Sequence, residues 1–402
     1  MTTDAEPAVR SRRRQSVLIA AALVTGAAGA ITLIVSQRHL DLDAFAPLAQ
    51  LWTIWAVLAA GLTFSFQQWA AVHGARRRDI MPGGSAPRVG AALVAGSIAL
   101  LVITTLARDA LFHSSSWVWP IAAAMLPFGT AVNGIRRGEL ARARHLVGLG
   151  GVIAGENLIR LTVSLLLITL DADAPWFAAA MLAGFLVVVG PSAPEGEREP
   201  ATAGMGTLST AALAGFLAYA FMFGSPLLLA AAGGTAVEVS ALFLVLTGVR
   251  IPFVVLQAVV PQLAVGLTNA ADRSRAVATT RRTLGVVALA GSSAAAVAGH
   301  FLGDVIIGSV FGIRGEVGDT SYALVSAASV FAACALVGTV VLVVEGRPRH
   351  IAVAWGVPAA TAPFVVATGA IADTVLLSLW LAASQATVAI ITLVRFRNDG
   401  PT

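Results

Sequence analysis

Three charged side chains inside long apolar segments are the residues of this sequence whose type and spacing could do chemistry. Glu156 and Arg160 lie in the apolar segment 146–170, and Arg250 lies in the segment 239–267. Glu156 precedes Arg160 by four residues, which is the favourable order for an ion pair on one face of a helix. Ionisable groups are costly in a bilayer, and where they occur they usually mark a functional site.

Both arginines would lie deep in a membrane if these segments are helices that cross it. At 1.5 Å per residue, Arg160 is roughly 21 Å along its segment and Arg250 roughly 16 Å. A guanidinium is a planar fork that grips phosphate oxygens with two hydrogen bonds. We therefore predict that Arg160 and Arg250 bind an anionic group of a cargo, and that Glu156 binds it or couples an ion.

The same residues allow a structural interpretation. Glu156 and Arg160 could pair only with each other and lock helices together, and Arg250 could bond carbonyl groups that Pro252 has loosened. Three further polar residues, Asn133, Gln67 and Gln257, are candidates to contact polar groups, such as hydroxyls, of the same cargo. Their alternative role is to form hydrogen bonds between helices.

The composition indicates which elements position these side chains. The chain has 402 residues, of which 57% are hydrophobic and only 12% are charged, and its mean hydropathy is +0.84. Soluble domains carry about 25% charged residues, so the sequence predicts an all-α integral membrane protein. We expect twelve spans of about 20 residues. They are 16–37, 45–72, 89–108, 116–135, 146–170, 174–191, 207–232, 239–267, 283–308, 321–345, 350–370 and 373–395.

The arginines support this map. It puts 21 of the 26 cationic residues on the side of the N-terminus, three (Arg38, Arg108 and Arg314) on the other side, and two inside spans. Such asymmetry predicts an even number of spans in the plasma membrane with both termini in the cytoplasm. The first span could instead be a signal peptide, but its apolar run continues to Ser36, which favours an uncleaved span.

A polar, proline-bounded segment divides the map into two halves of six spans. We predict a basic N-terminus (1–15), an N-lobe (16–191), a cytoplasmic linker (192–206), a C-lobe (207–395) and a cytoplasmic tail (396–402). Because both halves begin on the same side, any repeat would be parallel, with an axis along the membrane normal. Two such bundles would enclose a central cleft for cargo.

The residue inventory excludes several kinds of chemistry. The sequence has no lysine, so it can form neither a P-loop nor a Schiff base. One cysteine and six scattered histidines give no metal-ligand spacing. We therefore expect no enzyme activity, no cofactor and no resident metal. The arginines lie between apolar runs, which indicates topology rather than nucleic-acid binding.

Several short motifs resemble one superfamily of membrane transporters. They are Ala44-Phe-Ala-Pro-Leu-Ala-Gln-Leu-Trp52, Ala75-Arg-Arg-Arg78, Gly155-Glu-Asn-Leu-Ile-Arg-Leu161, Arg250-Ile-Pro252 with Val260-Pro-Gln-Leu263, and Gly346-Arg-Pro-Arg-His350. Together they resemble the polysaccharide flippases of the multidrug/oligosaccharidyl-lipid/polysaccharide (MOP) exporter superfamily. The sequence departs from many relatives at Gln67-Gln68, where an acidic residue is expected, and in having twelve spans where lipid II flippases usually have fourteen.

This resemblance implies a MATE/MOP-like pair of six-helix lobes and alternating access. It implies a cargo of lipid-linked oligosaccharide, of the undecaprenyl-phosphate type, flipped across the cytoplasmic membrane. We expect a monomer in the lipid bilayer, with glycan-assembly enzymes as candidate partners.

Three alternatives stay open at this stage. One is a small-molecule or drug exporter of the same superfamily. Another is an integral-membrane glycosyltransferase or polymerase, for which the acidic pairs Asp41/Asp43 and Asp171/Asp173 could hold a divalent cation. The last is a scaffold subunit of an envelope-assembly complex.

Overall fold

The structure is a computed structural model in which every regular element of the described residues is helical. The described residues are 5–73, 76–82, 84, 86–143, 145–189, 220, 223–268, 272–345, 347–367 and 373–394. Within these ranges the side chains of some residues, Arg250 and Gln257 among them, are not described. The predicted all-α fold is confirmed for this part of the chain.

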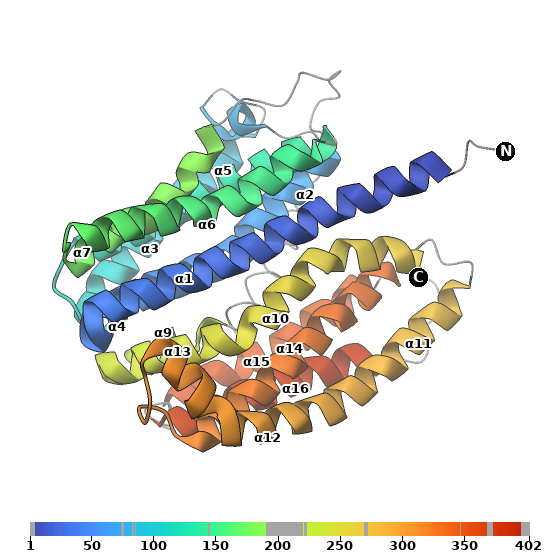
Figure 1. Ribbon diagram of the computed structural model, residues 1–402. Helices are drawn as coiled ribbons and strands as arrows, with labels where there is room; N and C mark the ends of the chain where they lie inside the picture. Colours follow the sequence, from blue (N-terminus) through green and yellow to red (C-terminus); the bar gives the residue numbers. More distant parts are fainter. Residues whose placement is uncertain are drawn as a thin grey trace. The chain divides into compact units, whose positions relative to one another are not determined.

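The chain divides into two compact units, an N-terminal unit (Met1–Phe243) and a C-terminal unit (Leu244–Thr402). The elements of the N-terminal unit are shown in blue to yellow-green in Figure 1. They are α1 (Ala5–Leu58), the π-turn η1 (Ala59–Thr63), α2 (Phe64–His73), the 3₁₀ turn η2 (Arg77–Ile80), α3 (Pro87–Leu106), α4 (Arg108–Phe112), α5 (Val118–Arg142), α6 (Leu146–Thr169), α7 (Ala174–Ala183), the 3₁₀ turn η3 (Gly184–Val189), α9 (Ser225–Ala231) and the start of α10 (Ala236–Thr268).

The C-terminal unit takes the rest of α10 and the elements that follow it in the chain. These are α11 (Arg273–Val286), the π-turn η4 (Val287–Gly291), α12 (Ser292–Gly303), the π-turn η5 (Asp304–Gly308), α13 (Ser309–Phe311), α14 (Asp319–Val344), α15 (Pro348–Ala367) and α16 (Thr374–Leu393). In this unit α14 packs along both α12 and α16.

Seven helical runs in the described residues are long and apolar enough to cross a membrane. They are Ser16–Ala71, Pro87–Leu106, Val118–Arg142, Leu146–Thr169, Ser274–Phe311, Asp319–Leu342 and Thr374–Leu393. The first run is 56 residues long and contains the predicted spans 16–37 and 45–72. Asp41 lies between them in a left-handed conformation (φ 57°), which interrupts the helix. These runs are consistent with twelve spans, although part of 207–232 and the linker 192–206 lie outside the described residues.

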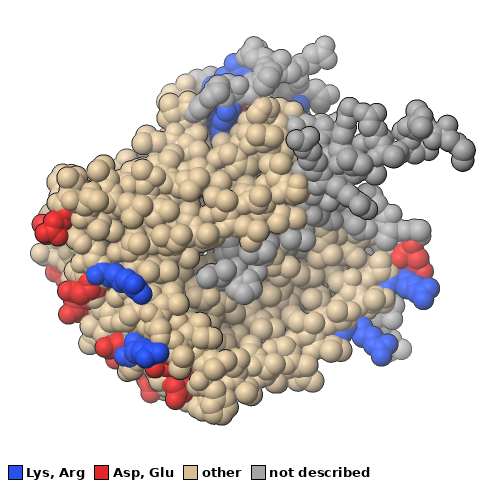
Figure 2. All heavy atoms as spheres, viewed as in Figure 1, with Lys and Arg blue, Asp and Glu red and all other residues tan. Residues whose placement is uncertain are grey.

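Charged side chains gather toward the ends of the helices. Figure 2 shows an uncharged middle on the face it presents, with acidic and arginine side chains beyond it. The exposed acids of the described residues include Asp109, Asp171 and Glu316, all in turns or at helix ends. An apolar band between charged ends is what a helix bundle in a bilayer requires.

Short polar side chains begin several helices. The Nδ1 atom of His145 accepts a hydrogen bond from the backbone N–H of Gly148 (3.1 Å) at the start of α6. The Asp373 carboxylate accepts from the N–H of Val375 (2.7 Å) at the start of α16. Such caps satisfy donors that the first helical turn leaves without partners.

Two glycines of α5 let that helix approach its neighbour closely. A Cβ atom at Gly134 would collide with the carbonyl oxygen of Thr63, and one at Gly138 would collide with that of Gln67. The two glycines are four residues apart and therefore lie on one helix face. Small residues at this spacing allow membrane helices to pack backbone to backbone.

We predict that Gly138→Ala destabilises the protein, because the added methyl group must push the backbone of α2 away. The loss should be about 1–3 kcal/mol, as for other overpacked sites. The measurement is the unfolding transition of the purified protein in detergent. Gly151→Ala on α6 is the matched control, since its Cβ atom would meet nothing within 4 Å. Equal behaviour of the two variants would contradict this account of the packing.

Candidate functional site

Helix α6 places a polar stripe inside the N-terminal unit. Its buried residues include Glu156, Asn157, Arg160 and Ser164, whereas Leu158, Leu165 and Leu166 are exposed. This is the reverse of a soluble amphipathic helix, and it suits a helix whose outer face meets lipid. The polar stripe therefore has to find its partners within α6 or on the helices packed against it.

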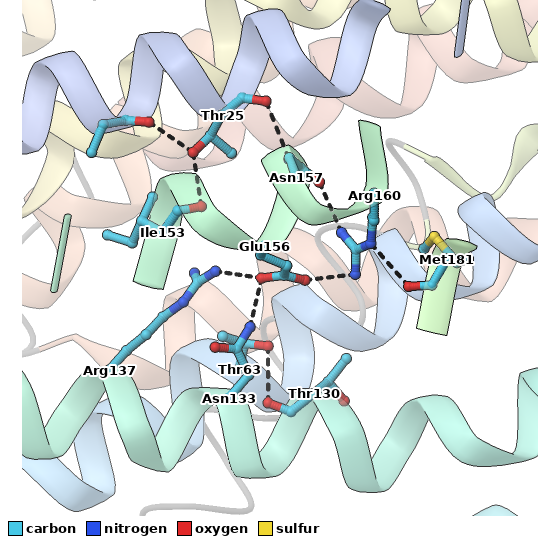
Figure 3. A network of polar contacts seen from close by, with 11 residues as sticks. Thr25, Thr63, Thr130, Asn133, Arg137, Ile153, Glu156, Asn157, Arg160 and Met181 are labelled. Atoms are coloured by element: carbon cyan, nitrogen blue, oxygen red, sulfur yellow. Dashed lines mark hydrogen bonds and ion pairs between the residues drawn. The ribbon is translucent and has the colours of Figure 1, made fainter. Parts of the chain in front are cut away.

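Arg160 is fully buried, and each of its three nitrogens donates a hydrogen bond. Its Nη2 donates to Glu156 Oε1 (2.7 Å), its Nη1 donates to Asn157 Oδ1 (2.9 Å), and its Nε donates to the carbonyl oxygen of Met181 (3.0 Å) (Figure 3). A buried guanidinium is tolerated only when it is paired and hydrogen-bonded in this way.

Aromatic rings surround the same guanidinium. Its central carbon lies 4.2 Å from the ring centroid of Trp55 and 5.7 Å from those of Trp52 and Phe185. Cation–π contact with these rings adds to the electrostatic stabilisation of the charge. Gly184 leaves room for the group, since a Cβ atom there would lie 2.6 Å from Arg160 Nε.

The carboxylate of Glu156 has partners on both of its oxygens. Oε1 accepts from Arg160, and Oε2 accepts from Asn133 Nδ2 (2.6 Å) and from Arg137 Nη2 (2.7 Å). Figure 3 shows Asn133 and Arg137 reaching Glu156 from α5. One carboxylate thus faces two guanidiniums, and the cluster Arg137–Glu156–Arg160 carries one positive charge in excess when all three groups are ionised.

Further hydrogen bonds connect this cluster to α1. Asn157 Nδ2 donates to the carbonyl oxygen of Thr25 (3.2 Å), and the Thr25 hydroxyl donates to the carbonyl oxygen of Ile153 (2.9 Å). Both contacts are drawn in Figure 3. The polar network therefore joins α1, α5, α6 and α7 within the N-terminal unit.

Among the predicted site residues, the structure brings together Glu156, Arg160 and Asn133. Glu156 and Arg160 form the predicted same-face ion pair, but the pair is not self-contained as the structural interpretation had it, because Glu156 also pairs with Arg137. Gln67 is half-buried on α2 and forms no side-chain hydrogen bond with the described residues. The side chains of Arg250 and Gln257 on α10 lie outside what the structure describes, so their roles stay predictions.

Sequence reasoning missed Arg137, Asn157 and the two tryptophans. The predicted span 116–135 stops before Arg137, but α5 continues to Arg142. The helix can extend because Arg137 pairs with Glu156, while Arg136 lies 3.5 Å from the Glu139 carboxylate. The available signals were the four-residue spacing of Asn133 and Arg137 and the three-residue spacing of Trp52 and Trp55, each of which puts two side chains on one face.

The acidic pairs considered for a glycosyltransferase have local roles in this structure. Asp41 Oδ1 accepts from the N–H of Ala44 (3.0 Å), and Asp171 is almost fully exposed, 4.0 Å from His39 Nε2. Within the described residues no three His, Cys, Asp or Glu side chains come together as a metal-binding group.

No protein-family model and no curated protein matches the sequence. Its structure, by contrast, is similar to solved MATE transporters. The crystal structure of the eukaryotic MATE transporter AtDTX14 has 13% sequence identity and a TM-score of 0.59, and the match covers 96% of this chain and 95% of that chain.

Two structures, each described as a multidrug resistance MATE family transporter of the MOP superfamily, are similar in different conformations. The inward-facing structure has 15% identity and a TM-score of 0.57, with 94% of this chain and 93% of that chain covered. The outward-facing structure has 12% identity and a TM-score of 0.56 over the same shares. This chain therefore has the MATE-like fold that the sequence predicted.

We predict that Glu156→Gln destabilises the protein far more than Arg137→Gln. The first change leaves two buried guanidiniums without their carboxylate, which should cost about 3–5 kcal/mol. The second leaves Glu156 paired with Arg160 and Asn133, and should cost about 1 kcal/mol. The measurement is the unfolding transition of each purified variant in detergent, compared with that of the wild-type protein.

The order of these two effects is the informative result. A loss for Arg137→Gln as large as that for Glu156→Gln would contradict the charge count of the cluster. Leu158→Ala, on the exposed face of the same helix, is the control and should unfold much as the wild-type protein does.

Proposed function

We propose that this protein is a secondary membrane transporter that flips a lipid-linked oligosaccharide or polysaccharide precursor across the cytoplasmic membrane. The fold supports a transporter that works by alternating access, because it is similar to MATE structures in both inward-facing and outward-facing conformations. A ligand shifts such an equilibrium only through a difference in its affinity for the two states.

The excess positive charge of the Arg137–Glu156–Arg160 cluster is the observation that carries the proposed cargo class. The one carboxylate of the cluster is already bonded to both guanidiniums and to Asn133. A cationic cargo would find no free carboxylate there, whereas an anionic cargo would compensate the surplus charge. A lipid-linked glycan carries phosphate or pyrophosphate and so has the required sign.

A drug or small-molecule exporter is the second candidate. It is favoured by the similarity to structures described as multidrug resistance MATE transporters. A cationic drug would require an acid that is not bonded to arginine. The two functions therefore differ in the sign of the charge that is transported.

The proposed function also implies a location, a topology and partners for the protein. We propose a multi-pass protein of the plasma membrane with cytoplasmic termini, acting as a monomer beside glycan-assembly enzymes. Flipping makes and breaks no bond, so it needs no catalytic group. The gradient or downstream reaction that drives it would act on the same equilibrium between the two conformations.

We predict that Arg250→Ala lowers transport of a fluorescent lipid-linked oligosaccharide in proteoliposomes at least about tenfold. The reason is the loss of hydrogen bonds to a charged group, each contributing about 1.5–3 kcal/mol. Arg250→Lys should also impair transport, because an ammonium lacks the bidentate fork. Arg282→Ala, an exposed arginine of α11, is the control.

The same vesicles are tested with a cationic dye. Transport of the glycan lipid by the wild-type protein, without transport of the dye, is the expected result. Dye transport without glycan transport would overturn the proposed function in favour of the drug exporter. Full glycan transport by Arg250→Ala would remove Arg250 from the site.

A further inference from the structure

We propose that Arg137, and not Arg160, is the residue of the cluster that binds the phosphate group of a ligand, with the amide oxygen of Asn133 accepting a ligand hydroxyl beside it. The inference deepens the proposed function and rests on it for the identity of the cargo. It concerns one face of α5, on which these two residues lie one turn apart.

The hydrogen bonds of the two arginines differ in number. Arg160 uses all three of its nitrogens. Arg137 makes one side-chain hydrogen bond with the described residues, from Nη2 to Glu156 Oε2, and its buried Nε has no partner among them. A guanidinium has five N–H donors, so most of the donors of Arg137 remain available.

Charge points to the same residue. Glu156 Oε1 and the carbonyl oxygen of Met181 compensate Arg160 inside a closed aromatic surround. Arg137 has only a share of the same carboxylate, through Oε2. The surplus positive charge of the cluster therefore falls on Arg137, where an anion would be stabilised.

Accessibility distinguishes the two guanidiniums as well. The side chain of Arg137 is 15% exposed and that of Arg160 is 0% exposed. Arg137 lies five residues before the end of α5 at Arg142, about 8 Å along the helix axis. A headgroup entering from that end of the helix would reach Arg137 before the enclosed part of the cluster.

Asn133 supplies the complementary acceptor. Its Nδ2 donates to Glu156, and its buried Oδ1 has no hydrogen-bond partner among the described residues. Unpaired buried polar atoms are rare and usually indicate a missing partner. A phosphate monoanion offers oxygens for Arg137 and a P–OH for Asn133 Oδ1, and a sugar hydroxyl would serve the same acceptor.

The test compares binding of farnesyl phosphate, farnesol and inorganic phosphate to the purified full-length protein in detergent. The wild-type protein should bind farnesyl phosphate at least about tenfold more tightly than farnesol. Arg137→Gln should abolish this preference without weakening farnesol binding. Arg137→Lys should keep part of it, because it retains the charge and loses the fork.

Arg142→Gln is the matched control, since it removes the same charge from an exposed position of α5 and should leave the preference intact. A merely structural role of Arg137 would weaken the binding of both lipids alike, beyond the small loss of stability already expected for this variant. An unchanged preference in Arg137→Gln, or equal weakening of both lipids, would overturn the inference.

The remaining outcomes separate the possible sources of the phosphate. In one of them, inorganic phosphate competes with farnesyl phosphate at the same concentration and loses this competition in Arg137→Gln. That result would support the phosphate site and assign it to free phosphate. Failure of glycan-lipid transport by the wild-type protein would contradict the proposed function and leave this binding result unaffected.

Discussion

The structure of the N-terminal unit depends on one carboxylate, that of Glu156, held between two guanidiniums. Removing three charges from water is expensive, and the cost is offset only when the geometry satisfies nearly every polar atom. Arg160 meets this condition with three hydrogen bonds and the face of Trp55. Because the partners of Glu156 and Arg160 together come from α1, α5, α6 and α7, satisfying these charges also fixes how those helices pack.

Close packing and the polar network support each other. Lipid tails are as apolar as leucine, so membrane helices gain little from hydrophobic burial against one another and rely on small residues and hydrogen bonds. Gly138 brings α5 against α2, and the same helix carries Asn133 and Arg137, which donate hydrogen bonds to Glu156 of α6. Gly184 gives the Arg160 guanidinium the space that any larger residue would take.

Local sequence rules predicted the helical fold and the Glu156–Arg160 pair, because hydropathy and four-residue spacing depend only on neighbours in the chain. They could not predict which other helix would supply partners. Arg137 looked like a loop residue because hydropathy assigns arginine to the water side, yet a long side chain can reach back into the bundle. Whether the Arg160 guanidinium is open to a ligand or enclosed depends on Trp52, Trp55 and Met181, and only tertiary packing determines the positions of these residues.

Under the proposed function, the charge of this cluster would constrain the cargo more strongly than the fold does, since one fold can serve many cargoes. The Arg137–Glu156–Arg160 cluster keeps one positive charge in excess unless something outside it supplies a negative charge. In one conformation solvent or lipid headgroups can supply it, and in another a bound anion can. An anion that compensates Arg137 better in one state than in the other would shift the conformational equilibrium by that difference in affinity. The same unbalanced charge would then both select the cargo and couple its binding to the motion.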